Sequence, residues 1–154
     1  MAFALSTTRK DAINAIAKSK IAAGSVVVLR LLGPKGGPGT VFAAGFMSAL
    51  VGAGLGETVA VVTDGELSGL NSGITIGQVM PEAAEGGPLA AVRDDDTIAI
   101  DLNKKTIALE LSAEELAQRI AALPLLPPTT EKGWLAMYRQ LVQPLSKGAV
   151  LGER

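Results

Sequence analysis

The sequence of 154 residues contains no cysteine and no histidine. Without cysteine, the chain itself can form no disulfide, no thiolate nucleophile and no iron–sulfur ligand. Without histidine, it lacks the commonest general base and the commonest metal ligand. Any catalysis by this chain must therefore use carboxylates, lysine, tyrosine or hydroxyl groups, or groups that another polypeptide supplies.

Aromatic residues are also scarce, at 3% of the chain, although 48% of the residues are hydrophobic. The core must therefore be built from alanine, valine, isoleucine and leucine. A chain of 154 residues is long enough for one domain with a substantial core. We accordingly predict a single domain over residues 1–154, with residues 143–154 as a C-terminal tail.

Long hydrophobic runs and a strong net charge are absent too. The most apolar window, residues 41–56, is too short to span a bilayer, and residues 1–10 lack the hydrophobic segment of a signal peptide. The net charge of −1 offers no electrostatic surface for nucleic acid or for an anionic membrane. These absences predict a soluble, cytoplasmic protein with no nucleic-acid partner and no membrane partner.

The hydrophobic pattern that is present predicts four helices and about six strands. Helices are expected over residues 9–19, 40–51, 112–122 and 132–142, with one further helical turn in residues 80–87. Strands are expected over residues 25–32, 59–63, 74–79, 89–92, 97–102 and 107–111. The last two strands are expected to form a hairpin with one buried face. This mixed order indicates an α/β domain with a barrel-like or layered sheet, and the absence of a G-x-G-x-x-G motif argues against a Rossmann fold.

Two local details support individual helices. Ser112 followed by Glu115 matches the capping box that opens a helix. Trp134 and Tyr138 are about one helical turn apart, so they lie on the same side of the last predicted helix. We interpret these two aromatic residues as part of the core rather than as a functional pair.

Residues 63–73 form a polar, glycine-rich loop between two predicted strands. Loops held by a rigid scaffold commonly carry function, and Ser68 is the candidate base or nucleophile of this loop. A serine hydroxyl is too weak an acid to ionise without a neighbouring base, a metal or oriented amides. Ser68 alone therefore cannot be catalytic in a chain without histidine. The alternative is a structural connection in which Asp64 and Asn71 form side-chain turns.

Residues 33–39 form a second loop, with four glycines and two prolines in seven residues. It is not a Walker A phosphate loop, because Lys35 precedes the glycines instead of following them. Its successive backbone amides, next to Lys35, could still hold a carboxylate or a phosphate at the start of the following helix. A purely structural turn is the alternative.

Three sequence motifs occur in the same order as in one known protein family. They are Gly33-Pro34-Lys35-Gly36-Gly37-Pro38-Gly39, the T-D-G-x-x-S-G pattern of residues 63–69, and Pro81-Glu82-Ala83-Ala84-Glu85-Gly86-Gly87-Pro88. Together they resemble the C-terminal domain of the dihydroxy-acid and sugar-acid dehydratases, the family that includes phosphogluconate dehydratase. The resemblance covers about residues 11–150.

This resemblance implies a swivelling β/β/α domain, a barrel-like mixed sheet flanked by helices, that closes over a larger N-terminal domain. In the family, that N-terminal domain carries an iron–sulfur cluster and a magnesium ion. The reaction is an α,β-elimination of water from a hydroxylated acid, in branched-chain amino acid or sugar-acid metabolism. The family's base is the serine of the T-D-G-x-x-S-G motif, which corresponds to Ser68. The matching residues that we expect to contact substrate are Lys35, Gly36, Gly37, Asp64 and Gly69.

The sequence departs from the family pattern near the expected site. In the family the first loop usually continues as G-P-G-M-P-E, whose glutamate binds magnesium, but Phe42 occupies that position here. A phenyl ring cannot coordinate magnesium, which prefers hard oxygen ligands. Glu66 stands where the family commonly has arginine, and Leu70 stands where it usually has glycine. We therefore expect no metal ligand and no cofactor in this chain.

Two functions are consistent with these motifs. In the first, the chain is a dehydratase C-terminal domain that supplies the serine base of a hydro-lyase but is inactive until it joins an N-terminal domain or subunit. In the second, it is a stand-alone, non-catalytic paralogue that binds a small carboxylate, a sugar acid or a protein partner. A domain that lacks its N-terminal half exposes apolar surface, so we also expect it to form a homo-oligomer.

Overall fold

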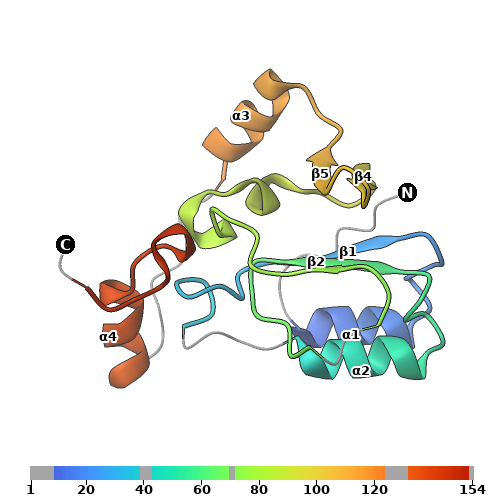
Figure 1. Ribbon diagram of the computed structural model, residues 1–154, viewed down its shortest axis with the longest axis horizontal. Helices are drawn as coiled ribbons and strands as arrows, with labels where there is room; N and C mark the ends of the chain where they lie inside the picture. The colour runs from blue at the N-terminus through green and yellow to red at the C-terminus, as the bar shows by residue number, and fades with distance from the viewer. Residues whose placement is uncertain (1–8, 39–42, 70–71, 124–131, 153–154) are drawn as a thin grey trace.

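The structure, a computed structural model, describes residues 9–38, 43–69, 72–123 and 132–152 and has a mixed α/β fold (Figure 1). The α-helices of these residues are α1 (Arg9–Ala17), α2 (Ala44–Gly52), α3 (Ala113–Ala121) and α4 (Trp134–Leu141). Their strands are β1 (Val26–Leu29), β2 (Ala60–Thr63), β3 (Thr75–Ile76), β4 (Ile98–Asp101) and β5 (Thr106–Leu109). Short 3₁₀ helices are η1 (Ala83–Glu85), η2 (Pro88–Ala91) and η3 (Leu145–Lys147). The predicted α/β class is confirmed.

A parallel sheet, in the order β1-β2-β3, lies at the centre of the fold. Strand β1 pairs with β2 from Val26 opposite Ala60 to Leu29 opposite Thr63. All four residues of β1 are buried. A parallel strand that is covered on both faces needs apolar side chains at every position, which explains why β1 is a continuous apolar run rather than an alternating one.

Helices α1 and α2 cover one face of this sheet (Figure 1). On this face Val27 of β1 and Val61 of β2 share a core with Phe46 and Leu50 of α2 and with Ala12 of α1. Each of these five side chains is at most 1% exposed. Because successive side chains of a strand point to opposite faces, the neighbouring residues of β1 and β2 point away from the helices.

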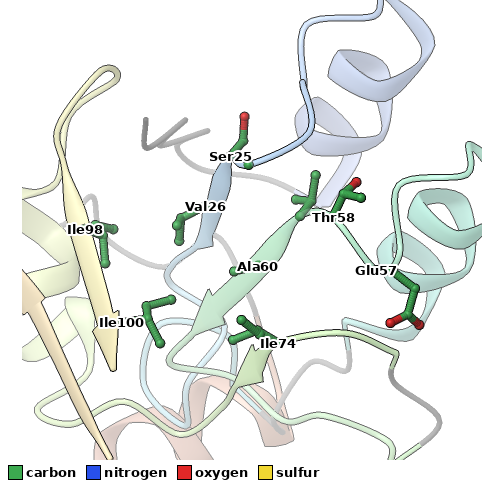
Figure 2. Close-up of a pocket in the computed structure, with 10 residues that line it drawn as sticks. Ser25, Val26, Glu57, Thr58, Ala60, Ile74, Ile98 and Ile100 are labelled. Carbon is green, nitrogen blue, oxygen red and sulfur yellow. The ribbon is translucent and has the colours of Figure 1, made fainter. Parts of the chain in front are cut away.

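The opposite face of the sheet packs against η1, η2 and the β4–β5 hairpin. Val28 and Val62 of the sheet share a core with Leu89 of η2, and Ile98 and Ile100 of β4 pack against that core. Figure 2 shows the two isoleucines directed toward the sheet, beside a pocket of about 260 Å³ at the amino ends of β1 and β2. The predicted hairpin is confirmed, but its inward face is half-buried rather than buried.

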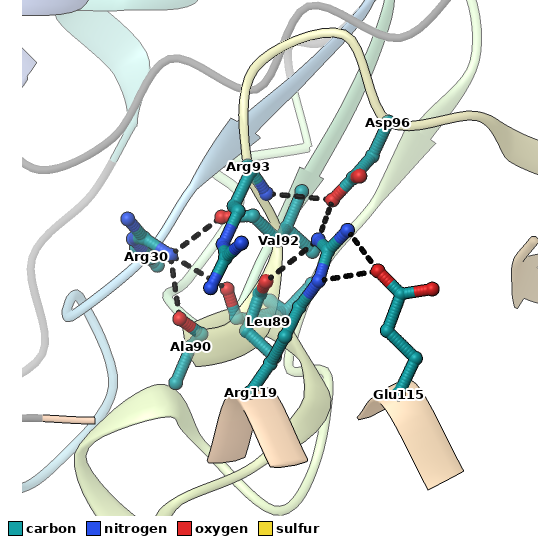
Figure 3. Close-up of polar contacts among 9 residues, drawn as sticks. Arg30, Leu89, Ala90, Val92, Arg93, Asp96, Glu115 and Arg119 are labelled. Carbon is teal, nitrogen blue, oxygen red and sulfur yellow. Dashed lines mark hydrogen bonds and ion pairs between the residues drawn. The ribbon is translucent and has the colours of Figure 1, made fainter. Parts of the chain in front are cut away.

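Arg30, directly after β1, holds the η2 segment against the sheet (Figure 3). Its Nη1 atom donates to the carbonyl oxygens of Leu89 (3.2 Å), Ala90 (2.8 Å) and Val92 (3.0 Å). The strand predicted at residues 89–92 is therefore wrong. Pro88 begins a 3₁₀ turn there, and carbonyl groups that the arginine has bound are not available to a neighbouring strand.

Arg119 of α3 holds the same segment from the other side (Figure 3). It donates to the carbonyl oxygen of Ala91 at 3.4 Å, and it forms ion pairs with Asp96 at 2.6 Å and with Glu115 at 2.8 Å. Burial alone would raise the pKa of Asp96. The hydrogen bonds that Asp96 accepts from Arg119 and from the backbone amide of Arg93 outweigh burial and lower this pKa. Helix α3 is thus tied to η2 by a charged contact.

The helix signals in the sequence were reliable, whereas some boundaries were not. The hydroxyl of Ser112 accepts a 3.1 Å hydrogen bond from the amide of Glu115, which confirms the predicted start of α3. Helix α2 begins at Ala44 rather than at residue 40, and residues 39–42 lie outside the described part of the chain. Strand β3 has two residues where six were predicted.

The C-terminal helix differs from the prediction in its environment. Trp134 is 64% exposed, so its interpretation as a core residue is wrong, and Tyr138 is half-buried. The two aromatic residues do lie on a helix, but no described element covers the Trp134 side of it. After this helix the chain reverses direction, so that Leu151 pairs with Val142 in an antiparallel β-bridge.

The strands of the described residues belong to two separate sheets, one parallel and one antiparallel, and they do not close into a barrel. The layered alternative to a barrel is therefore the arrangement that this part of the chain adopts. In the same residues, no helix combines the length and the apolar character that a membrane-crossing helix needs.

Candidate functional site

Asp64, the first residue after β2, lies beneath the loops that carry the motifs. Its side chain is 0% exposed. The carboxylate accepts hydrogen bonds from the backbone amides of Leu31 (3.1 Å), Leu32 (2.9 Å) and Ala83 (2.9 Å). A single buried carboxylate thus joins the chain after β1, the chain after β2 and the start of η1. The structure therefore places Asp64 where it fixes the geometry of the loops.

Glu82, just before η1, does the same for the first glycine-rich loop. It is 0% exposed, and its carboxylate accepts hydrogen bonds from the backbone amides of Lys35 (2.9 Å) and Gly36 (2.9 Å). Burial is the main cause of a raised pKa at Glu82, and the nearby Asp64 and Glu85 raise it further, while the two amide hydrogen bonds oppose the shift. The amides that we expected to hold a carboxylate do hold one, and it belongs to this chain.

Two positions of this loop have room only for glycine, because a side chain there would contact neighbouring atoms too closely. A Cβ atom on Gly33 would lie 2.5 Å from Oε2 of Glu82, and a Cβ atom on Gly36 would lie 2.7 Å from the Cα atom of Leu31. Both distances are below those that real Cβ atoms show. The amide of Gly37 donates to the carbonyl oxygen of Gly33 at 2.7 Å, which closes the turn. The glycines therefore allow the backbone to wrap around the Glu82 carboxylate.

The side chain of Lys35 points to a second carboxylate. Its Nζ atom forms an ion pair with Oε1 of Glu85 on η1, and the two side chains are 30% and 17% exposed. Lys35 is therefore partly accessible at the edge of the loop. An incoming anion would have to share this ammonium group with Glu85.

Ser68, the candidate base, lies in an accessible position. The residue is exposed and borders an open pocket of about 420 Å³, whose other lining residues, from α2, are Ala44, Met47, Ser48, Val51 and Gly52. None of these lining residues is an acid or a base. Gly69 follows with a φ of +79°, a backbone conformation that glycine adopts without strain. The structure thus presents the Ser68 hydroxyl to solvent without a titratable neighbour in this pocket.

A smaller pocket, of about 180 Å³, is where distant motif segments meet. Its lining residues come from the first glycine-rich loop, from the T-D-G-x-x-S-G motif, from the segment after β3 and from the C-terminal segment: Pro34, Asp64, Gly65, Glu66, Gln78, Leu145, Gly148 and Ala149. The carboxylate of Glu66 accepts a hydrogen bond from the side-chain Nε2 atom of Gln78 at the edge of this pocket. Ser68 does not line it. The structure therefore brings the first two motif loops together but places Ser68 on a different pocket.

Asp64 is among the site residues expected from the sequence, whereas Glu82 is not. Glu82 stands in the third motif, yet nothing in its neighbourhood in the sequence shows that a carboxylate there is fully buried. The sequence could have indicated this burial only if two motifs had been considered together. The first glycine-rich loop has backbone amides that need an acceptor, and Glu82 of the third motif is a carboxylate that could accept from them. Phe42, at the position of the family's magnesium ligand, lies outside the described residues.

The described residues contain no group of three or more carboxylates placed to hold a metal ion. The whole sequence has no cysteine for an iron–sulfur cluster and no histidine. The side chains of the described residues therefore fit neither a magnesium ion nor an iron–sulfur cluster. The carboxylates of Asp64 and Glu82 are instead bound by backbone amides.

Comparison with protein families identifies one match. The family model described as dihydroxy-acid/6-phosphogluconate dehydratase C-terminal matches residues 4–149. This range includes every element from α1 to η3, and therefore the pockets described above.

Comparison with individual proteins gives a consistent result. The chain is 48% identical over 142 residues to a dihydroxy-acid dehydratase of Caldicellulosiruptor bescii, which covers 92% of this chain and 26% of that protein. It is 47% identical over 144 residues to a dihydroxy-acid dehydratase of Sulfurisphaera tokodaii, which covers 94% of this chain and again 26% of the relative. The chain thus spans about a quarter of the length of these relatives.

Proposed function

Because this chain belongs to the dihydroxy-acid/6-phosphogluconate dehydratase C-terminal family, we propose that it is the base-carrying part of a hydro-lyase, with Ser68 as the base. The observation that carries this proposal is the position of Ser68. Its motif is anchored by the buried Asp64, while Ser68 itself is exposed beside an open pocket. A buried anchor followed by an accessible hydroxyl is the arrangement that a positioned base needs.

In the proposed reaction, the deprotonated Oγ of Ser68 accepts the proton from C2 of a 2,3-dihydroxy acid, and the electron pair of the C2–H bond forms the C2–C3 double bond as the C3 hydroxide leaves. The proton held by Ser68 is then returned to this hydroxide, so that water is released and the base is regenerated. The enol that forms then becomes a 2-oxo acid. The lining of the Ser68 pocket is neutral, and a serine hydroxyl needs help to give up its own proton. We therefore expect this chain to be inactive alone.

The proposal includes a second polypeptide that corresponds to the other three quarters of the relatives, as an N-terminal domain or subunit. An iron–sulfur cluster would have to be held there, because this chain has no cysteine. A magnesium ion would also be held there, since the described residues contain no group of three or more carboxylates placed to bind one. We further propose that the chain is a swivelling domain in the cytoplasm that closes over this partner. Lys35 and the loop after it would then contact the carboxylate of the substrate.

A non-catalytic role is the alternative that two observations favour. The amides of Lys35 and Gly36 are already bound to Glu82, and Phe42 replaces an expected carboxylate. Both features suit a domain that keeps the scaffold and binds a small carboxylate or a protein partner without turnover.

The test is an assay of dehydration with 2,3-dihydroxy acids and sugar acids. The chain would be assayed alone and after co-expression with the N-terminal part of the Caldicellulosiruptor bescii relative. We expect turnover only in the second case, and a loss of about 100-fold or more in Ser68→Ala, the range for a missing general base. Ser48→Ala, which changes the same pocket, is the matched control and should keep activity.

Turnover by the chain alone would contradict the proposal, as would equal losses in the two serine variants. If no turnover occurs in either case, a thermal-shift screen of carboxylates and sugar acids tests the alternative. Stabilisation by one of these acids, without turnover, would support the non-catalytic role.

A further inference from the structure

The C-terminal part of the chain exposes a cluster of apolar side chains. Twelve large hydrophobic residues of the described chain are exposed, and six of them lie within residues 134–151. These six are Trp134 (64% exposed), Leu135 (41%), Met137 (53%), Leu141 (44%), Val150 (54%) and Leu151 (49%). Exposed apolar residues that are scattered need no explanation, whereas clustered ones mark interaction sites.

Helix α4 carries four of the six. Trp134, Met137 and Leu141 follow one another at spacings of three and four residues, so they form a stripe on one side of the helix. The helix has eight residues, none of them buried. Figure 1 shows α4 apart from the sheet and from α1 and α2. A helix this short is marginal in water unless another element covers its apolar side.

The other two residues extend the same surface. The β-bridge between Val142 and Leu151, and the 3.0 Å hydrogen bond from the amide of Gln143 to the carbonyl oxygen of Val150, place residues 150–151 beside the end of α4. We use the name α4 face for the six exposed residues together. The α4 face thus holds six of the twelve exposed large hydrophobic residues of the described chain, and clustered exposed apolar residues mark interaction sites.

The comparisons show how much of the relatives has no counterpart in this chain. The region matched by the family model includes all of α4, so the helix is a shared element of the family and not a peculiarity of this chain. About three quarters of each relative has no counterpart here. We propose that the α4 face docks on the polypeptide that corresponds to those three quarters. This inference relies on the proposed function for the choice of partner and not for any role of Ser68.

The position and charge of the α4 face add detail to the proposal. Leu145, Gly148 and Ala149, which follow α4, line the pocket where the motif loops meet, so a partner on the α4 face would lie next to that pocket. Residues 132–143 contain two basic residues, Lys132 and Arg139, and no acidic residue. The complementary surface of the partner should therefore be an apolar groove with acidic residues at its rim.

The experiment measures binding and needs no turnover. The full chain would be co-expressed with the tagged N-terminal part of the Caldicellulosiruptor bescii relative, so that the two can fold together, and their co-purification would be quantified. The variant Met137→Lys with Leu141→Lys places two charges in the α4 face. Leu102→Lys is the control for a charge placed at an exposed apolar residue elsewhere, because Leu102 is 62% exposed and lies in the turn between β4 and β5. Circular dichroism would check that each variant is folded, and Leu141→Met would keep the face apolar.

We expect the wild type, Leu102→Lys and Leu141→Met to co-purify, and the double lysine variant to be retained at least about tenfold less, as for a central interface residue. Failure of the wild type to co-purify, or equal retention of the double variant, would overturn the inference. The alternative is that a second copy of the chain covers the α4 face. The fluorescence of Trp134, the only tryptophan, would detect this self-association. A concentration-dependent blue shift of its emission that the double variant abolishes, without co-purification, would assign the α4 face to self-association instead. A Ser68→Ala variant that docks normally but gives no turnover separates this result from the proposed function.

Discussion

The carboxylate of Glu82 accepts a 2.9 Å hydrogen bond from the backbone amide of Gly36, although the two residues are 46 positions apart in the sequence. Together with Asp64, which accepts three backbone hydrogen bonds, Glu82 converts two glycine-rich segments into one fixed surface. Both carboxylates are 0% exposed. The motifs by which this chain resembles a dehydratase are thus held together by buried carboxylates, whereas Ser68, the candidate base, is exposed.

The anchoring role of Asp64 predicts a large loss of stability in Asp64→Asn. The amide side chain keeps one oxygen but turns an NH₂ group toward backbone amides, so buried donors lose their acceptor. We expect the free energy of unfolding to fall by about 2–4 kcal/mol, since each unsatisfied buried group costs about 1–3 kcal/mol. Urea unfolding measures this. Asp94→Asn, at an exposed position, is the control and should change stability by no more than about 0.5 kcal/mol. A small effect of Asp64→Asn would refute the anchoring role.

Glu82 predicts a pH dependence with a defined sign. Its pKa is raised in the folded state above the ordinary value of 4.5, mainly by burial, so the folded protein binds this proton more tightly than the unfolded chain. Stability contributed by Glu82 is therefore full below pH 4.5 and decreases as the pH rises toward the folded pKa. Glu82→Gln removes this titration. The free energy of unfolding of the wild type minus that of the variant should therefore decrease as the pH rises above 4.5, and a constant or rising value would contradict the assignment.

Asp96 predicts the opposite sign. The net effect of its hydrogen bonds with Arg119 and with the Arg93 amide is a pKa below the ordinary value of 3.8. The contribution of Asp96 is therefore present above that value and is lost as the pH falls through the folded pKa. Arg119→Met should lower the melting temperature by about 2–4 °C at neutral pH. The difference from wild type should diminish below about pH 3.8, as followed by thermal melts, and a difference independent of pH would argue against this ion pair.

Two glycines provide a matched pair of substitutions with opposite expected effects. A Cβ atom on Gly33 would lie 2.5 Å from the Glu82 carboxylate, which the backbone amides of Lys35 and Gly36 hold in place. A Cβ atom on Gly45 in α2 would meet nothing within 4 Å. Gly33→Ala should destabilise the protein by about 1–3 kcal/mol, as overpacking typically does. Gly45→Ala should stabilise it by about 0.5–1 kcal/mol, because alanine restricts the unfolded chain and suits a helix. Denaturant unfolding of both variants checks the prediction, and equal effects would exclude the steric explanation.

Local sequence was sufficient for much of the fold. The apolar run of β1, the capping box at Ser112 and the alternating hairpin residues each predicted an element that the structure contains. These signals work because a strand or a helix is stabilised largely by which side chains face the core, and spacing along the chain decides this directly. The absence of cysteine and histidine likewise limits the chemistry of the chain, whatever its fold, because no arrangement of the backbone can supply a thiolate or an imidazole that the sequence lacks.

Other features depended on contacts between distant segments. Residues 89–92 are apolar enough for a strand, but Arg30 binds their carbonyl groups and Pro88 starts a turn, so they form a 3₁₀ helix. Trp134 has the spacing of a core residue, yet no described element covers it. Asp64 and Glu82 read as polar loop residues and are fully buried. Burial and hydrogen-bond partners are properties of the folded surface around a residue, and neighbours in the sequence do not specify them.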